Sequence, residues 1–357
     1  MNPRIIVDLK KLAHNGRHLA ELCRKHGMSA AAVTKVFCAE RPMVEVLAAL
    51  PIDYLADSRL ENIMAYPADI KQKTILLRLP SPSEAENVVR HCDISLNSEL
   101  ATLKLLAAAA DKLDKTHGVV LMVDLGDLRE GIYHTNSDGL FTAVQFILSA
   151  KGLDLLGIGT NLTCYGSVLP TAANLTQLTG IAKSIEDKFD IKLAMISGGN
   201  SSTLYLLDKG EIPAGINNLR LGESIVCGKE TAFGETFPGL ETDVVVLEAE
   251  IIEVARKPSM PEGQINVNAF GETIEYNDIG VHTRAIVGVG RQDVYYEGLT
   301  CLTDGVEIIG ASSDHLIVDA TNAKTPVAVG DRLRFSLSYG AVLAAFTSRY
   351  VDKVMQG

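Results

Sequence analysis

Residues 29–36 read Ser29-Ala-Ala-Ala-Val-Thr-Lys-Val36, an apolar run typical of a buried strand, and it ends beside one lysine, Lys35. Burying an unpaired ammonium is costly, and a lowered pKa of the amine avoids that cost. An amine that is neutral near pH 7 reacts with aldehydes, so Lys35 is a candidate nucleophile. The alternative, which the spacing alone favours, is a strand-end lysine whose stem lies on apolar surface while its head reaches water.

The composition of the 357-residue chain is that of a globular protein large enough for two domains, with 47% hydrophobic and 22% charged residues. A formal net charge of −11 argues against nucleic acid or an anionic membrane as the main partner. The six cysteines are scattered singly without a CxxC pair, which predicts reduced thiols and no zinc site. Without a signal segment or a membrane-spanning run, we expect an acidic cytoplasmic protein that binds no metal.

Short apolar runs alternate with helical stretches over the first two thirds of the chain. The runs expected to form strands are residues 29–36, 54–57, 74–79, 94–97, 119–125, 155–162, 193–198 and 217–222. Eight such runs separated by helices predict a closed parallel (β/α)8 barrel. An open doubly wound sheet is the alternative, but it usually carries a GxGxxG turn after its first strand, and none occurs here.

Beyond about residue 228 the pattern changes to β-rich segments with little helix between them. Residues 244–254, 285–290, 307–309, 315–320 and 332–339 predict a largely antiparallel β domain. Residues 341–354 predict a short helical tail. We therefore expect two domains, a barrel of residues 1–228 and a C-terminal β domain of residues 229–357.

The turn Ser197-Gly-Gly-Asn-Ser-Ser202 follows the seventh predicted strand and precedes a predicted helix. Its glycines allow close approach of the backbone, and its amides and hydroxyls face the start of the helix, which indicates a phosphate site. The alternative is an ordinary helix N-cap formed by Asn200 or Ser201. We favour the phosphate site because barrels commonly bind phosphate after strand seven.

Two arginines lie at strand ends, where barrels carry their functional residues. Arg220 lies inside the eighth run, and a guanidinium that cannot lose its proton needs an acceptor there. Gly222 and Glu223 would donate amides to the phosphate, whereas an internal Arg–Glu ion pair is the alternative role of Arg220. Arg129 is suited to holding a substrate carboxylate through two hydrogen bonds, although a solvated loop arginine is the commoner case.

This combination of lysine, phosphate turn, strand-eight arginine and β domain resembles the fold-type III pyridoxal-phosphate enzymes. Within them the chain is most similar to the alanine racemase-like amino-acid racemases, and among these to their ornithine racemase branch. The matching segments span nearly the whole chain. They are Val33-Thr-Lys-Val-Phe-Cys38, Gly159-Thr-Asn-Leu-Thr-Cys-Tyr-Gly166, residues 197–202, Asn268-Ala-Phe-Gly-Glu272, Gly290-Arg-Gln-Asp-Val294 and Gly310-Ala-Ser-Ser-Asp-His315.

The resemblance implies pyridoxal phosphate as the cofactor, with Lys35 holding it covalently and moving the substrate α-proton. Arg220 would hydrogen-bond the pyridine nitrogen and leave it unprotonated, which suits proton exchange better than decarboxylation or transamination. Arg129 would organise the substrate carboxylate. The other cofactor-binding candidates are Ser197, Asn200 and Ser201 of the phosphate turn, Gly222, Glu223 and, from the resemblance alone, Asn161 and Tyr339.

Four positions depart from the family pattern. Met122 stands where typical relatives have a carbamylated lysine, and Asn161 where they have a histidine that stacks on the cofactor ring. Ala39 replaces a phosphate-binding tyrosine. Phe270 aligns with the tyrosine that serves as the second catalytic base, and phenylalanine cannot transfer a proton. The candidates for that base are Tyr276, His282 and Cys164, although a lone histidine is more often a surface or hydrogen-bonded residue.

The substrate is expected to be ornithine or lysine, mostly from the branch resemblance. Asp314 aligns with a part of the β domain that faces the substrate, where its carboxylate would pair with a distal ammonium; its alternative role is to cap a turn. The resemblance also implies a head-to-tail homodimer with shared active sites.

Three alternative activities stay open: an alanine or broad-specificity racemase, a fold-type III decarboxylase of basic amino acids, and a non-catalytic cofactor carrier. Arg220 speaks against the decarboxylase, which typically has a glutamate at the ring nitrogen. The β domain speaks against the carrier, because the small single-barrel carriers lack one.

Overall fold

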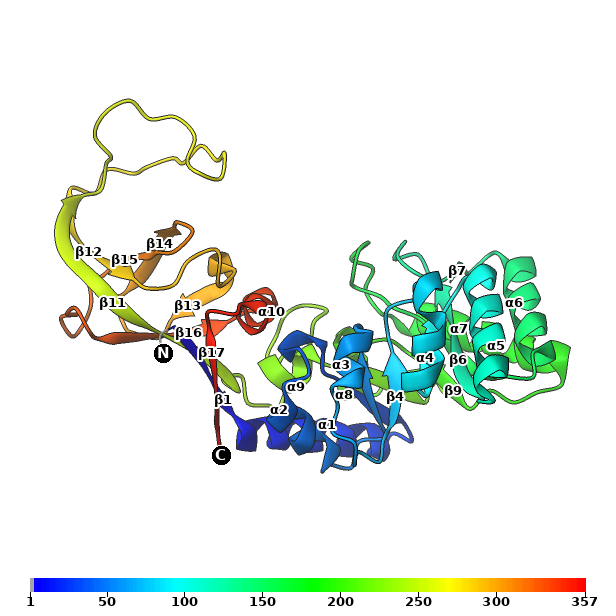
Figure 1. Cartoon of the computed structure of the whole chain (residues 1–357). Coiled ribbons are helices and arrows are strands. Elements are labelled where there is room, and N and C mark those ends of the chain that lie inside the picture. The colour runs from blue at the N-terminus through cyan, green and yellow to red at the C-terminus, as the bar shows by residue number, and fades with distance from the viewer. Residues whose placement is uncertain (1–2) are drawn as a thin grey trace. The chain divides into compact units, whose positions relative to one another are not determined.

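The computed structural model describes residues 3–357, which form two compact units (Figure 1). The barrel unit is Lys10–Thr242, and the β unit joins the described residues before Lys10 with Asp243–Gly357. The structural division thus falls later than residue 228, because the segment after Gly228 is bonded to the barrel unit. Asn15 donates to the carbonyl of Glu241 at 2.8 Å and accepts from the Glu241 amide at 2.8 Å.

Eight parallel strands close the barrel, as the alternating sequence pattern predicts. They are β2 (Ser29–Val33), β3 (Tyr54–Asp57), β4 (Lys73–Leu76), β5 (Ile94–Asn97), β6 (His117–Asp124), β8 (Leu153–Gly159), β9 (Met195–Ser197) and β10 (Asn218–Leu221). Each pairs with the next, and β10 pairs with β2 to complete the ring. The two-residue β7 (Ile132–Tyr133) pairs with β6 outside the ring.

Helix α1 precedes the first barrel strand, the other helices follow the barrel strands, and they lie on the outside of the barrel (Figure 1). They are α1 (Leu9–Lys25), α2 (Arg41–Ala48), α3 (Leu60–Met64), α4 (Ala85–His91), α5 (Leu100–Leu113), α6 (Ser137–Ser149), α7 (Ala172–Phe189), α8 (Leu204–Lys209) and α9 (Glu223–Cys227), with 3-10 turns η1 (Lys35–Phe37), η2 (Pro82–Glu84) and η3 (Ser201–Thr203). Their apolar faces are buried, as Leu12, Leu19 and Cys23 of α1 illustrate. Such burial is the main source of helix stability in proteins.

The barrel interior is filled by apolar side chains rather than forming a pore. Small residues such as Ala31 and Ala56 pack with larger ones such as Ile75, Leu96 and Met122. Layers of small and branched side chains are what a closed eight-strand barrel accommodates.

The β unit is largely antiparallel, as predicted. Its main sheet has the order β13-β16-β11-β12-β15-β14. These strands are β11 (Val245–Pro258), β12 (Val281–Val287), β13 (Leu299–Cys301), β14 (Glu307–Ala311), β15 (Leu316–Asp319) and β16 (Arg332–Leu337), with the turn η4 (Tyr296–Gly298) before β13. The long connection between β11 and β12, yellow in Figure 1, extends away from the sheet.

The predicted helical tail of residues 341–354 is only half right. Helix α10 (Tyr339–Thr347) ends early, and the chain finishes as β17 (Asp352–Gln356). Strand β17 pairs in parallel with β1 (Arg4–Asp8), which also pairs antiparallel with β11. The strand conformation depends on pairing with the opposite end of the chain, which a local sequence pattern does not report.

Candidate active site

Lys35 lies at the C-terminal mouth of the barrel, two residues beyond the end of β2. The preceding Thr34 is fully buried, and its hydroxyl donates to a carboxylate oxygen of Asp57 at 2.6 Å and contacts the Tyr66 hydroxyl at 2.7 Å. Lys35 itself is half-buried, and no hydrogen bond or ion pair of its amine occurs within residues 3–357. Burial and the nearby Arg129 guanidinium lower the pKa of Lys35, while Cys164 and Asp57 act in the opposite direction.

The turn of residues 197–202 forms a helix cap and also carries buried hydroxyl groups. Asn200 caps η3, since its side-chain oxygen accepts from the Ser202 amide at 2.8 Å. Ser201 is buried, and its hydroxyl lies 3.0 Å from the Ser224 hydroxyl and accepts from the Ser224 amide at 3.3 Å. The Ser202 hydroxyl oxygen is buried without a partner in the described part of the chain. Asn200 therefore caps η3 as considered, and the hydroxyl groups of Ser201 and Ser202 lie next to this cap.

Arg220 occupies the barrel interior with only 3% of its surface exposed. It donates to the Thr160 carbonyl at 2.7 Å, to the Asn161 side-chain oxygen at 2.6 Å and to the Ser197 hydroxyl. Burial lowers the pKa of Arg220 to about 10, against the opposing charge of Glu130. No carboxylate pairs with it directly in the part of the chain that is described, so the predicted alternative of an internal Arg–Glu pair does not occur.

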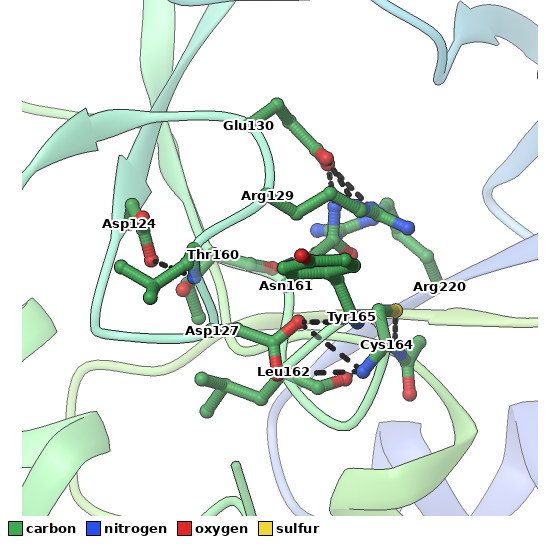
Figure 2. A network of polar contacts seen from close by, with 12 residues as sticks. Asp124, Asp127, Arg129, Glu130, Thr160, Asn161, Leu162, Cys164, Tyr165 and Arg220 are labelled. Carbon is green, nitrogen blue, oxygen red and sulfur yellow. Dashed lines mark hydrogen bonds and ion pairs between the residues drawn. The ribbon is translucent and has the colours of Figure 1, made fainter. Parts of the chain in front are cut away.

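Arg129 lies on the loop after β6 with 40% of its side chain exposed. It is not a free solvated arginine, because it forms an ion pair with the neighbouring Glu130. Glu130 also accepts a hydrogen bond from the Asn161 amide group. Figure 2 shows these side chains as one network that reaches Arg220. The sequence analysis identified both arginines and Asn161 but not Glu130, whose only sequence signal is its place beside Arg129.

The loop after β8 is anchored by Asp127, a buried residue that the sequence analysis also missed (Figure 2). Its carboxylate accepts from the amides of Cys164 at 3.2 Å, Tyr165 at 2.9 Å and Val168 at 3.1 Å. This anchor holds Cys164 at the mouth, where its exposed side chain accepts from the Asn200 amide group at 3.6 Å. Cys164 also acts electrostatically on Lys35, so the two side chains are near one another.

Gly222 and Glu223 lie where β10 passes into α9. Burial raises the pKa of the Glu223 carboxyl to about 7, while Lys229 and Lys35 oppose the shift. Glu223 therefore belongs to the same electrostatic cluster as Lys35.

The remaining predicted residues, Tyr276, His282, Asp314 and Tyr339, belong to the β unit. His282 on β12 is buried, with Nδ1 2.9 Å from the Asp319 carboxylate and Nε2 3.2 Å from Arg284 Nε. Both ring nitrogens of His282 thus have hydrogen-bond partners, which agrees with the alternative role of a hydrogen-bonded histidine. Tyr276 lies exposed between β11 and β12, and Tyr339 begins α10. Asp314 is exposed and accepts from the Ser313 hydroxyl at 2.5 Å, as a turn residue would.

Phe270 lies exposed in the connection between β11 and β12, with the guanidinium of Arg291 4.3 Å from its ring centre. Arg291 also pairs with Glu272 at 2.8 Å and is stacked 4.8 Å from the ring centre of Tyr296. These contacts hold the Asn268–Glu272 segment against the β unit.

The chain is similar in sequence to known proteins. Residues 7–229 match the family model described as "Alanine racemase, N-terminal domain". A protein named ornithine racemase from Acetoanaerobium sticklandii is 46% identical over 99% of both chains. The chain belongs to the alanine racemase family. A second relative from this family, named lysine racemase, comes from Thermotoga maritima and is 36% identical over 99% of this chain and 98% of its own. The chain is accordingly an amino-acid racemase.

Solved alanine racemases share the fold at low sequence identity. The enzyme from Streptomyces lavendulae has a TM-score of 0.75 at 17% identity and covers 99% of this chain and 97% of its own. The enzyme from Bartonella henselae, described with covalently bound pyridoxal phosphate, has a TM-score of 0.74 at 17% identity and full coverage of both chains. Across residues 3–357, no helix is long and apolar enough to cross a bilayer, and no three His, Cys, Asp or Glu side chains are grouped as a metal site.

Proposed function

We propose that this racemase is pyridoxal-phosphate dependent and interconverts L- and D-ornithine. The observation that carries the substrate is the 46% identity to ornithine racemase along the whole of both chains. Lysine is the second candidate, supported by the 36% identity to lysine racemase. The two relatives named above do not support the decarboxylase or the carrier.

The residues at the barrel mouth fit the proposed cofactor. When bound, pyridoxal phosphate supplies an aldehyde that condenses with amines and an electron sink that acidifies the α-hydrogen of an amino acid. Lys35, with its lowered pKa, would bind it covalently. The buried hydroxyls of Ser201 and Ser202, the second without a partner within residues 3–357, suit phosphate oxygens. Backbone amides of Gly222 and Glu223 complete this proposed site, and we include Asn200 and Tyr339 in it.

Arg220 would donate to the pyridine nitrogen from the barrel interior. Its guanidinium is held there by hydrogen bonds to three acceptors, the Thr160 carbonyl, the Asn161 side chain and the Ser197 hydroxyl. A guanidinium keeps its proton, so the ring nitrogen facing it would stay unprotonated. This arrangement favours reversible proton transfer over reactions that need a stronger electron sink.

Racemisation requires proton transfer on both faces of the α-carbon. Lys35 serves one face in this proposal. For the other face Tyr276, His282 and Cys164 remain candidates, and Cys164 shares the barrel mouth with Lys35. Separate Tyr276→Phe, His282→Gln and Cys164→Ala variants distinguish them: the variant that retains α-hydrogen exchange but loses inversion identifies the second base.

Substrate recognition is assigned to two charged groups. Arg129 would hold the α-carboxylate, since its side chain is partly exposed and already ordered by Glu130. Asp314, which is exposed, would attract the distal ammonium of ornithine. Replacing Asp314 by Asn is expected to raise KM for ornithine while leaving KM for alanine unchanged.

We also propose a homodimer in which each β unit contributes to the active site of its partner. The connection between β11 and β12 supports an interface, because it exposes the large apolar residues Ile265, Val267, Phe270, Ile274 and Ile279. Light scattering of the protein tests the dimer: a monomer with full activity would contradict it. The cytoplasmic location stays a prediction.

The first experiment follows α-hydrogen exchange in D2O by proton NMR, with pyridoxal phosphate added. L-ornithine, L-lysine and L-alanine are tested separately with wild type, Lys35→Ala and the surface control Lys183→Ala. Exchange with inversion of ornithine that is lost only in Lys35→Ala supports the proposal. Inversion of lysine alone favours the second candidate. No exchange with any of the three contradicts the proposal.

A further inference from the structure

The two arginines of the barrel mouth differ in how their charge is balanced. Arg129 has a direct ion pair with Glu130, whereas Arg220 is buried with only neutral acceptors around its guanidinium. A buried guanidinium without an anion nearby is expensive because it cannot become neutral. The compensating charge has to come from a residue beyond these direct contacts.

Glu130 is that residue, and Asn161 connects it to Arg220. The amide group of Asn161 donates to Oε1 of Glu130, while its side-chain oxygen accepts from Arg220 at 2.6 Å. The same Oε1 accepts from Nη2 of Arg129 at 2.5 Å. Only 15% of the Glu130 side chain is exposed, so water screens its charge weakly. One carboxylate therefore contacts one arginine directly and the other through a single amide (Figure 2).

Among the described residues no carboxylate forms an ion pair with Arg220, and Glu130 is the main opposing charge that acts on it. The neighbouring position on β6 is Met122, which is fully buried in the apolar core cluster. A Cβ added to Gly159 would lie 3.4 Å from the Met122 sulfur and 3.5 Å from the Arg220 guanidinium. The Met122 sulfur and this guanidinium therefore lie on the same side of Gly159. The β6 residue near Arg220 is thus apolar, and the negative charge comes from the loop that carries Glu130.

The loop that carries Glu130 is tightly constrained. Gly131 adopts φ +132, and a Cβ there would lie 2.4 Å from the Asp124 amide nitrogen. Asp124 accepts from the amides of Gly126 at 2.8 Å and Leu128 at 3.2 Å. These contacts constrain the backbone on both sides of Glu130, from which its side chain reaches Arg129 and Asn161.

We propose that Glu130 is a positioning residue that orients Arg129 and, through Asn161, sets the electrostatics of Arg220. The inference rests on the proposed function in that Arg129 faces the substrate carboxylate and Arg220 the cofactor ring. Loss of the Glu130 charge then has two separate effects. Arg129 becomes free to move, which weakens substrate binding, and the hydrogen-bonding environment of Arg220 changes, which alters the bound cofactor.

The test compares Glu130→Gln, an isosteric neutral variant, with Glu130→Asp, which keeps the charge on a shorter stem. The control is Glu45→Gln, which removes an exposed carboxylate that pairs with Arg41 on α2. Measurements are kcat and KM for ornithine, the absorbance spectrum of the bound cofactor, and thermal unfolding of the apoprotein by circular dichroism. For Glu130→Gln we expect kcat/KM to fall by about 10- to 100-fold, with a raised KM and a shifted cofactor absorbance. Glu130→Asp should recover part of both effects, and Glu45→Gln should show neither.

A double-mutant cycle separates positioning from a general structural role. If Glu130 acts on Arg220 through Asn161, the spectral shift caused by Glu130→Gln should disappear in the Asn161→Ala background. A spectrum and kinetics of Glu130→Gln within twofold of wild type would overturn the inference while leaving the racemase proposal intact. An additive cycle would also overturn it. If the wild type fails to racemise ornithine, the proposed function fails, and the cofactor spectrum of Glu130→Gln still decides the role of Glu130.

Discussion

The hydroxyl of Thr34 donates to the buried carboxylate of Asp57 at 2.6 Å, which ties the end of β2 to the end of β3 directly before Lys35. Asp57 also accepts from the Arg59 amide at 2.8 Å and the Asn62 amide group at 3.1 Å. A buried carboxylate with several donors holds its surroundings firmly, because losing any donor leaves it undersatisfied. The backbone that presents Lys35 is therefore fixed by polar contacts as well as by packing.

Replacing Thr34 by Val tests this contact, since the two side chains have nearly the same shape. We expect a loss of about 1–3 kcal/mol in the free energy of unfolding, because a buried carboxylate loses a donor. Urea denaturation measures it. The control Thr142→Val removes a hydroxyl that bonds only within α6, to the Asp138 carbonyl, and should cost less than about 0.5 kcal/mol. Equal losses in both variants would contradict the special role of Thr34.

The Glu223 carboxyl should make the stability of the apoprotein depend on pH. Its pKa is raised from 4.5 to about 7, so between these pH values the folded state binds more protons than the unfolded state. The raised pKa stabilises the folded state fully below pH 4.5, and this stabilisation is lost as the pH rises through 7. Glu223→Gln removes the effect, so the stability of wild type relative to this variant should fall over that range by at most about 3 kcal/mol. A constant difference, measured by urea denaturation across the range, would contradict the raised pKa.

Asp127 should control the order of the loop that carries Cys164. Its carboxylate accepts three backbone amides, those of Cys164, Tyr165 and Val168. In Asp127→Ala we expect these amides to exchange with solvent about 10- to 100-fold faster, because each loses its acceptor. Hydrogen exchange followed by mass spectrometry measures this, with peptides of α7 as the internal control. Asp127→Asn, which keeps one acceptor oxygen, should show a smaller increase, and unchanged exchange in Asp127→Ala would refute the anchoring role.

Two glycines provide a matched pair for the loop beside Glu130. Gly131 has φ +132 and a Cβ there would meet the Asp124 backbone at 2.4 Å, so Gly131→Ala should cost about 2–5 kcal/mol. Gly180 is exposed in the middle of α7 with nothing within 4 Å of the added Cβ. Gly180→Ala should therefore stabilise the protein by about 0.5–1 kcal/mol. Thermal unfolding of both apoproteins checks the opposite signs, and a tolerated Gly131→Ala would show that the loop can relax.

The barrel could be predicted because its signals are local. Residues 54–57 and 94–97 were predicted as strands, and both strands have these bounds. Lys35 and Arg220 were recognised as residues at or near strand ends because apolar runs bracket them. One strand boundary was wrong where a polar turn follows: the first run was expected to continue to residue 36, but β2 ends at Val33 and Lys35 lies in η1. A 3-10 turn after a strand has no strong signal in the sequence.

The sequence by itself determined the alternating strands and helices, the antiparallel texture of the second unit and the residue types at the barrel mouth, because each depends on neighbours in the chain. Only the tertiary structure decided that Glu130 reaches Asn161, that Asp127 binds the loop of Cys164, and that β17 pairs with β1. These contacts join residues far apart in sequence. Barrel closure brings the first two together by setting neighbouring strand ends side by side, and the sheet of the β unit brings β17 to β1. The sequence specifies the charge of Glu130. Only the fold decides that this carboxylate contacts Arg129 and, through Asn161, Arg220 instead of being solvated.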